Sequence, residues 1–234
     1  MEIEYKPNNE KQIEVCSGGP YIVTGGIPLV SKIQVVSEYG EPLSWRKTGE
    51  IAIPAEGYFL CRCGQSTDMP FCDGTHAKIQ FDGTETAPID SINARRETYA
   101  GCRNILIHID PSICTSSGFC ANRNTSIAEM ATHTDDTQVR ALAIAMIEHC
   151  PSGALTYTLE AGQDDIEVDL PQQISVTTEI TSQGAIRGPL WVTGGIRIIR
   201  SDGQPIEPRN RLTLCSCGRS QIKPLCDGSH RDLR

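Results

Sequence analysis

The chain of 234 residues lacks the features that define several large classes of protein. It contains no run of 18 apolar residues, so no segment is expected to span a membrane. Its formal net charge is −8 and it contains no cluster of basic residues, which argues against nucleic acid as a partner. Aromatic residues make up only 5% of the chain, whereas Gly (21) and Pro (14) are plentiful. This composition favours short strands and small cores over one large core.

The sequence also contains no arrangement that indicates catalysis or export. No nucleophile is paired with a base, and no phosphate-binding loop or flavin fingerprint is present, so we expect that the protein is not an enzyme. The first residues, MEIEYK, have neither the apolar core of a signal peptide nor the Arg-rich character of a transit peptide. We therefore expect a cytoplasmic protein whose 11 cysteines are reduced and available for other chemistry.

What the sequence does contain is one cysteine–histidine pattern in two copies. In each copy one residue separates two cysteines, eight residues lead to a third cysteine, and three more lead to a histidine. The copies are Cys61, Cys63, Cys72 and His76, and Cys215, Cys217, Cys226 and His230. The identical spacing of three thiols and one imidazole indicates a metal site in each copy, because the donors must converge to within about 2.0–2.3 Å of a metal.

The repeat continues upstream of the cysteines. Residues 19–26 (GPYIVTGG) are echoed by residues 188–195 (GPLWVTGG), and β-branched, strand-like stretches follow each of them. The expected strands cover residues 27–36, 58–60, 196–199 and 212–214. Each unit is too small to bury much apolar surface, so we expect the two copies to pair within the chain.

These residues resemble the CDGSH, or NEET, iron–sulfur family, whose defining stretch is C-x-C-x2-S-x3-P-x-C-D-G-S-H. The second copy matches every position, and the first differs only in having Thr75 for Ser. The resemblance implies one 2Fe–2S cluster per motif, with the first two cysteines on one iron and the Cys–His pair on the other. It also implies a β-rich unit in which two motifs pair around a pseudo-two-fold axis. The family commonly has Lys before the Pro; Lys223 fits this, whereas Met69 does not, so the electrostatics of the two sites are expected to differ.

A different segment lies between the copies. Residues 105–109 are predicted to form a strand, and residues 136–149 an amphipathic helix, because apolar residues recur there with a 3.6-residue period. Thr134 and Asp135 are the expected caps of this helix. Polar linkers at residues 82–93 and 159–170 separate the segment from the two copies.

Three cysteines of the middle segment, Cys114, Cys120 and Cys150, are the elements of a single-cluster ferredoxin site, with Pro151 after the last and Ser117 in the middle slot of the bacterial pattern. Residues 99–159 resemble a divergent single-cluster ferredoxin family that often accompanies CDGSH motifs. Three thiolates suit a 3Fe–4S cluster. A 4Fe–4S cluster would need Ser117, water or Cys102 as a fourth ligand, and the alternative is a degenerate domain that binds nothing. Cys16 and Cys102 are otherwise expected to be ordinary thiols.

We therefore predict an α+β fold in which a β-rich, NEET-like unit of two pseudo-symmetric repeats (1–82 and 171–234) flanks a ferredoxin-like domain (95–160). The favoured function is electron transfer with an unidentified redox or cluster-acceptor protein. Cluster storage or transfer and redox or pH sensing are alternatives. A zinc-stabilised interaction module is less consistent with the motif, because zinc-binding cysteine pairs are usually separated by two to four residues.

Overall fold

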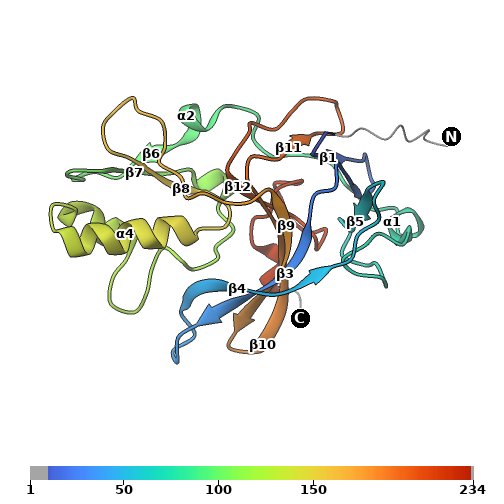
Figure 1. Cartoon of the computed structure of the whole chain (residues 1–234), viewed down its shortest axis with the longest axis horizontal. Helices are drawn as coiled ribbons and strands as arrows, with labels where there is room; N and C mark the ends of the chain where they lie inside the picture. The colour runs from blue at the N-terminus through green and yellow to red at the C-terminus, as the bar shows by residue number, and fades with distance from the viewer. Residues whose placement is uncertain (1–9, 233–234) are drawn as a thin grey trace.

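The computed structural model describes residues 10–232, which form three β-sheets with few helices (Figure 1). This mixed, sheet-rich architecture agrees with the predicted β-rich unit that carries an insert. The first sheet has the strand order β11-β1-β2-β5. Its strands are β1 (Gln12–Val15), β2 (Tyr21–Thr24), β5 (Tyr58–Leu60) and β11 (Arg197–Ile199).

The second sheet has the order β12-β10-β9-β3-β4. Its strands are β3 (Leu29–Val36), β4 (Pro42–Ile51), β9 (Gln173–Thr181), β10 (Gly184–Thr193) and β12 (Arg211–Leu214). Each large sheet contains strands from both the N-terminal and the C-terminal part of the chain. In the first sheet β11 lies parallel to β1, and in the second β3 lies parallel to β9. The four strands predicted from the sequence correspond to β3, β5, β11 and β12. The long strand β4 was not predicted, since its residues are largely exposed and show no apolar alternation.

The middle segment forms a third sheet with the order β6-β7-β8. The strands are β6 (Glu97–Thr98), β7 (Leu106–Ile109) and β8 (Leu155–Thr158), and the helix α4 (Thr137–His149) lies beside them (Figure 1). The prediction of this strand and helix is confirmed, but the predicted caps are wrong. The Asp136 carboxylate caps α4 by accepting the N–H groups of Gln138 (2.7 Å) and Val139 (3.3 Å).

The remaining helical elements are short. They are α1 (Thr75–Lys78), α2 (Ile92–Arg95), α3 (Ile127–Met130) and the 3₁₀ turns η1 (Pro111–Ile113), η2 (Ala131–His133) and η3 (Ser229–Asp232). Among the helices of residues 10–232, none has both the length and the apolar character required to cross a bilayer.

One hydrophobic cluster connects all parts of the chain. It includes Tyr21 and Leu60 of the first sheet, Ile107 and Ile147 of the middle segment and Leu214 of the second sheet, all nearly inaccessible to solvent. A series of aromatic contacts reinforces the junction of the middle segment with the second sheet. Trp45 of β4 lies 5.7 Å from both Trp191 and Phe119, measured between ring centroids, and the Phe119 ring stacks on His149. The middle segment is therefore packed against the sheets that carry the repeated motifs.

A buried arginine links the last strand to the middle segment. Arg211 of β12 is 1% exposed. Its guanidinium donates to the Ile147 carbonyl of α4 (3.1 Å) and the Leu155 carbonyl of β8 (3.2 Å), and pairs with the Glu167 carboxylate at 2.6 Å. Loss of the guanidinium would remove one donor from each carbonyl and the cationic partner of the Glu167 carboxylate, while Ile147 would keep the Cys150 N–H (3.0 Å) and Glu167 the Asn210 amide (3.3 Å).

We predict that Arg211→Met lowers the free energy of unfolding by about 2–4 kcal/mol, because two buried carbonyls each lose a donor and the Glu167 carboxylate loses its cationic partner. Chemical unfolding followed by circular dichroism measures this change. Arg46→Met on the exposed strand β4 is the control and should change stability by less than about 0.5 kcal/mol. Equal stabilities of the two variants would show that Arg211 does not hold the junction.

Candidate metal centres

In each motif, a short backbone ladder brings the third cysteine beside the first two. The strand β5 ends immediately before Cys61, whose N–H donates to the Pro70 carbonyl at 2.9 Å, while the N–H of Cys72 donates to the Phe59 carbonyl at 2.9 Å. The chain therefore folds back on itself between the two cysteine-bearing stretches. The second motif repeats both bonds, from Cys215 to Pro224 (2.8 Å) and from Cys226 to Thr213 (3.0 Å).

The motif's serine and aspartate shape the connecting turn. Ser66 donates its hydroxyl to the Phe71 carbonyl at 2.6 Å, and the Asp73 carboxylate accepts the N–H groups of Thr67 (2.8 Å) and Thr75 (3.0 Å). The second motif has the same bonds, from Ser220 to Leu225 (2.7 Å) and to Asp227 from Gln221 (2.7 Å) and Ser229 (2.9 Å). Both carboxylates are thus occupied by backbone donors, which leaves cysteine and histidine as the available metal ligands.

The predicted ligands lie in close pairs. In the first motif the Cys61 and Cys63 sulfurs are 3.6 Å apart, and the Cys72 sulfur is 3.2 Å from Nδ1 of His76. The second motif has the equivalent pairs, Cys215 with Cys217 (3.7 Å) and Cys226 with His230 Nδ1 (3.4 Å).

These pair distances fit two ligands on one tetrahedral metal. Thiolates about 2.3 Å from such a metal lie about 3.8 Å apart, and a thiolate and an imidazole nitrogen about 3.5 Å apart. Within the described part of the chain, no three His, Cys, Asp or Glu side chains are grouped so that they could hold one metal ion. Burial raises the pKa of Cys63 to about 11 and also raises that of Cys226, so a metal must displace thiol protons when it binds.

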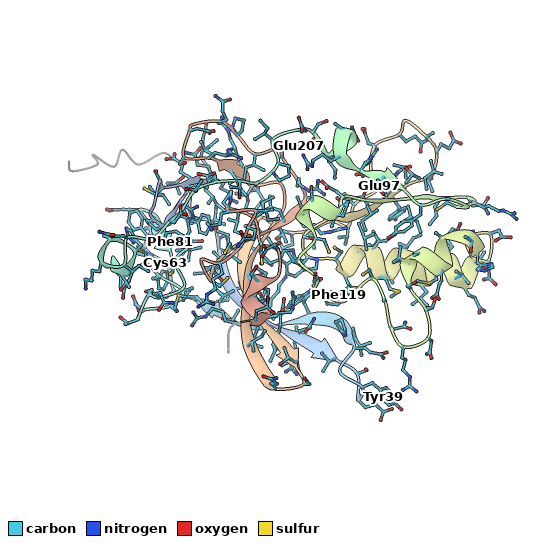
Figure 2. All side chains as sticks on the ribbon, turned by 180° about the vertical axis from the view of Figure 1, so that it is seen from behind. Tyr39, Cys63, Phe81, Glu97, Phe119 and Glu207 are labelled. Carbon is cyan, nitrogen blue, oxygen red and sulfur yellow. The ribbon has the colours of Figure 1, made fainter. Side chains whose placement is uncertain are left out.

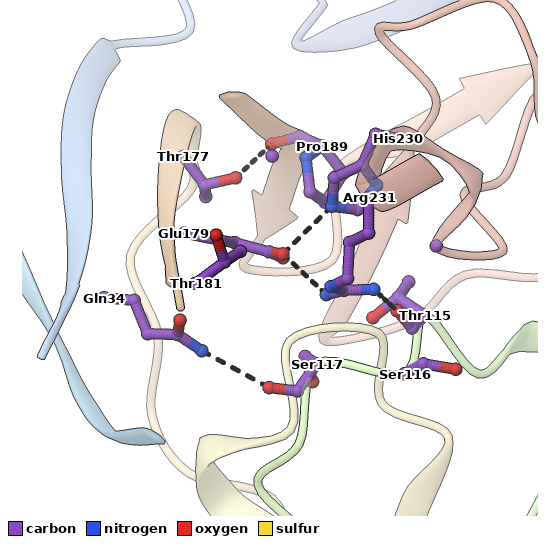
Figure 3. Close-up of polar contacts among 12 residues, drawn as sticks. Gln34, Thr115, Ser116, Ser117, Thr177, Glu179, Thr181, Pro189, His230 and Arg231 are labelled. Atoms are coloured by element: carbon purple, nitrogen blue, oxygen red, sulfur yellow. Dashed lines mark hydrogen bonds and ion pairs between the residues drawn. The ribbon is translucent and has the colours of Figure 1, made fainter. Parts of the chain in front are cut away.

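The two motifs differ in the burial of their Cys–His pair. Cys72 and His76 are partly exposed, whereas Cys226 and His230 are buried. Nε2 of His230 lies 3.0 Å from Oε2 of Glu179, a buried residue of β9 that also pairs with Arg231 at 2.7 Å (Figure 3). No hydrogen bond to Nε2 of His76 is found among residues 10–232.

The first motif has a buried cation where the second has a serine. Arg62, between Cys61 and Cys63, donates to the carbonyls of Cys16 (2.6 Å) and Gly83 (3.1 Å), whereas the equivalent Ser216 donates its hydroxyl to the Gly188 carbonyl. The thiol of Cys16 is near enough to the first motif that its charge is among those that raise the pKa of Cys72, after the larger effect of burial. The electrostatic surroundings of the two motifs are therefore different.

The structure also brings the three cysteines of the middle segment together. Partial burial, and then the charges of Cys114 and Cys150, raise the pKa of Cys120, so both thiols lie within electrostatic reach of Cys120. They are not grouped around a single metal position. A wider spacing suits a cluster in which each iron takes one cysteine. Cys102 is partly buried and packs against the hydrophobic cluster.

Glu179 is the site residue that sequence reasoning missed. It lies 51 residues from His230 in the sequence and outside both motifs, so spacing gives no indication of their contact. The sequence shows only that the polar residues Ser175, Thr177 and Glu179 recur at every second position of β9, on the face that the structure buries. A carboxylate at an inward position of a strand requires a buried partner.

Comparison with protein-family models gives two matches. Residues 18–77 and 187–231 match the iron-binding zinc finger of CDGSH type, and residues 99–160 match the divergent 4Fe–4S mono-cluster family. The chain thus carries two CDGSH-type iron-binding segments with a divergent 4Fe–4S mono-cluster segment inserted between them, which confirms both resemblances. No curated protein and no solved structure matches the chain.

We predict that Glu179→Gln raises the reduction potential of the C-terminal CDGSH site and leaves that of the N-terminal site unchanged. A carboxylate that accepts the ring N–H of a ligating histidine makes the imidazole a stronger donor, which favours the oxidised metal. The expected shift is on the order of 60 mV, equivalent to about tenfold in a one-electron equilibrium.

Redox titration followed by EPR measures this shift, and Glu50→Gln on the exposed face of β4 is the matched control. If the C-terminal potential moves no further than it does in the control, Glu179 does not tune that site.

Proposed function

We propose that the protein transfers electrons and binds two 2Fe–2S clusters, one in each CDGSH motif. The observation that carries this proposal is the separation of the donors into pairs, at 3.2–3.7 Å within each pair. Two pairs serve two irons, whereas a zinc ion would need all four donors around one point. When bound, such clusters supply one-electron chemistry without a catalytic residue, which agrees with the view that the protein is not an enzyme.

The proposed ligands in the first motif are Cys61 and Cys63 for one iron, and Cys72 and His76 for the other. Cys215, Cys217, Cys226 and His230 have the same roles in the second motif. Exchange of one thiolate for a neutral imidazole makes the centre less negative and easier to reduce. The potentials should therefore lie between about −400 mV for four-cysteine centres and roughly −150 to +300 mV for two-histidine centres.

We further propose that the two motifs form one pseudo-symmetric unit. The exchange of β11 and β3 between the two large sheets supports this proposal. A reciprocal contact between the glycines that follow Cys63 and Cys217 supports it too. A Cβ on Gly64 would lie 2.5 Å from the Cys217 carbonyl oxygen, and a Cβ on Gly218 would lie 2.6 Å from the Cys63 carbonyl oxygen. Glycine permits this close approach in both directions.

A third cluster, of 3Fe–4S or 4Fe–4S type, is proposed at Cys114, Cys120 and Cys150 in a ferredoxin-like domain. The divergent 4Fe–4S family match and the electrostatic influence of Cys114 and Cys150 on Cys120 support it. The presence of three clusters in one chain favours electron transfer with an unidentified redox protein over the storage of clusters.

Cluster storage, transfer to an acceptor protein or redox or pH sensing is the second candidate function. It is favoured by the partial exposure of Cys72 and His76, through which an acceptor could reach the first site. A zinc-stabilised interaction module, the third candidate, would give colourless, redox-silent protein.

We predict that Cys72→Ser and Cys226→Ser each remove about half of the 2Fe–2S absorbance, because each substitution takes one ligand from one of two sites with the same ligand set. Iron and acid-labile sulfide should fall in parallel, while the other site keeps its EPR signal. Full retention of the visible spectrum by either variant would contradict the ligand assignment of that motif.

We also predict that an iron chelator bleaches the N-terminal site faster than the C-terminal site. Cys72 and His76 are partly exposed, whereas Cys226 and His230 are enclosed by the protein. The Cys226→Ser protein, which retains the N-terminal site, should therefore lose its absorbance sooner in bipyridine than the Cys72→Ser protein. The reverse order would show that burial of the Cys–His pair does not protect the cluster.

A further inference from the structure

The ligand-bearing loops of the C-terminal CDGSH site and the middle site touch each other. Gly228 lies between Cys226 and His230, and Thr115 follows Cys114 directly. A Cβ built on Gly228 would lie only 2.8 Å from the Thr115 carbonyl oxygen, so the two backbones meet at a distance that only glycine permits.

Hydrogen bonds to sulfur extend this contact on both sides. The N–H of Gly228 donates to the Cys226 sulfur at 3.4 Å, and the N–H of Ser116 donates to the Cys114 sulfur at 3.4 Å. The Thr115 carbonyl and the Ser116 N–H belong to the same peptide group. A single peptide group and one glycine therefore connect a thiol of one site with a thiol of the other.

An ion pair fixes the two loops in this position. Arg231, next to His230, donates to the Thr115 carbonyl and pairs with Glu179, which also contacts the His230 ring (Figure 3). The backbone carbonyl of Ser117, in the same loop as Thr115, accepts a hydrogen bond from the Gln34 side chain of β3 at 3.3 Å.

Among residues 10–232, Gly74 of the N-terminal site makes no contact with the middle segment like that of Gly228. A Cβ on Gly74, the counterpart of Gly228, would have no atom of the described structure within 4 Å. The first motif instead meets the second through the contacts of Gly64 and Gly218. Figure 2 shows Cys63 of the first motif near one end of the molecule, with Phe119 of the middle segment well removed from it.

We propose that the C-terminal site is the central member of a series of three, and that single electrons pass between it and the middle site through the Gly228–Thr115 contact. This inference rests on the proposed function, since it requires clusters at both sites. One electron leaves one site and is taken up by the other, so the exchange balances without a further reagent. The rate of electron tunnelling falls steeply where the path crosses a gap between non-bonded atoms. The path between the two sites runs through covalent and hydrogen bonds and crosses one such gap, the close contact of Gly228 with Thr115.

The first test uses EPR of dithionite-reduced protein, in which a paramagnetic middle cluster speeds the relaxation of a nearby 2Fe–2S centre. The Cys72→Ser protein retains the C-terminal centre, and the Cys226→Ser protein retains the N-terminal one. The half-saturation power of the 2Fe–2S signal should be several-fold higher in the first protein. Addition of Cys114→Ser should remove the difference.

The second test measures the rate of electron exchange after rapid photoreduction. Gly228→Ala should slow the exchange between the C-terminal and middle sites several-fold, because the added methyl group separates the loops. Gly74→Ala is the matched control. Gly74 has a positive φ of 83°, similar to the 94° of Gly228, but open space beside it, so the rate of exchange between the C-terminal and middle sites should equal that of the parent protein.

Equal half-saturation powers in two fully loaded proteins would overturn the proposal, and so would equal exchange rates in the two alanine variants. A middle site that holds no iron would also overturn it, while leaving the CDGSH assignment intact. A parent protein that shows no 2Fe–2S spectrum would instead contradict the proposed function.

Discussion

The structure depends on one constraint that is met twice, the convergence of three thiols and one imidazole from two stretches of chain. In each motif two backbone hydrogen bonds, such as those from Cys61 to Pro70 and from Cys72 to Phe59, close the turn and bring the two donor pairs next to each other. The serine and aspartate of the motif satisfy the backbone of this turn. Metal binding at these turns adds stability to the fold.

The surrounding fold gives the two motifs different environments. The exchanged strands β11 and β3 connect the motifs, and Thr115 of the inserted middle segment meets the C-terminal motif at Gly228, whereas the corresponding Gly74 of the first motif has open space beside it in residues 10–232. The C-terminal histidine is thereby enclosed and contacts Glu179, while His76 stays partly exposed. A duplicated motif has thus become one enclosed site beside the middle segment and one accessible site at the edge.

The local features of the sites could be predicted from the sequence, because they follow from spacing within a short stretch of chain. The strands leading to Cys61 and Cys215 and the helix α4 are examples. The cap of α4 was predicted one or two residues too early, since several polar residues in succession could serve. The contacts of Glu179 and Gly228 could not be predicted, because their partners are distant in sequence and follow only from the packing of three segments.

Mössbauer spectroscopy of ⁵⁷Fe-loaded protein carrying Cys114→Ser and Cys150→Ser tests the central claim most directly. This variant retains the two CDGSH motifs and removes two of the proposed ligands of the middle site. The account predicts two diamagnetic doublets of equal area in the oxidised protein, one from iron with two cysteines and one from iron with a cysteine and a histidine. A single type of iron site, or stoichiometric zinc in place of iron, would contradict it.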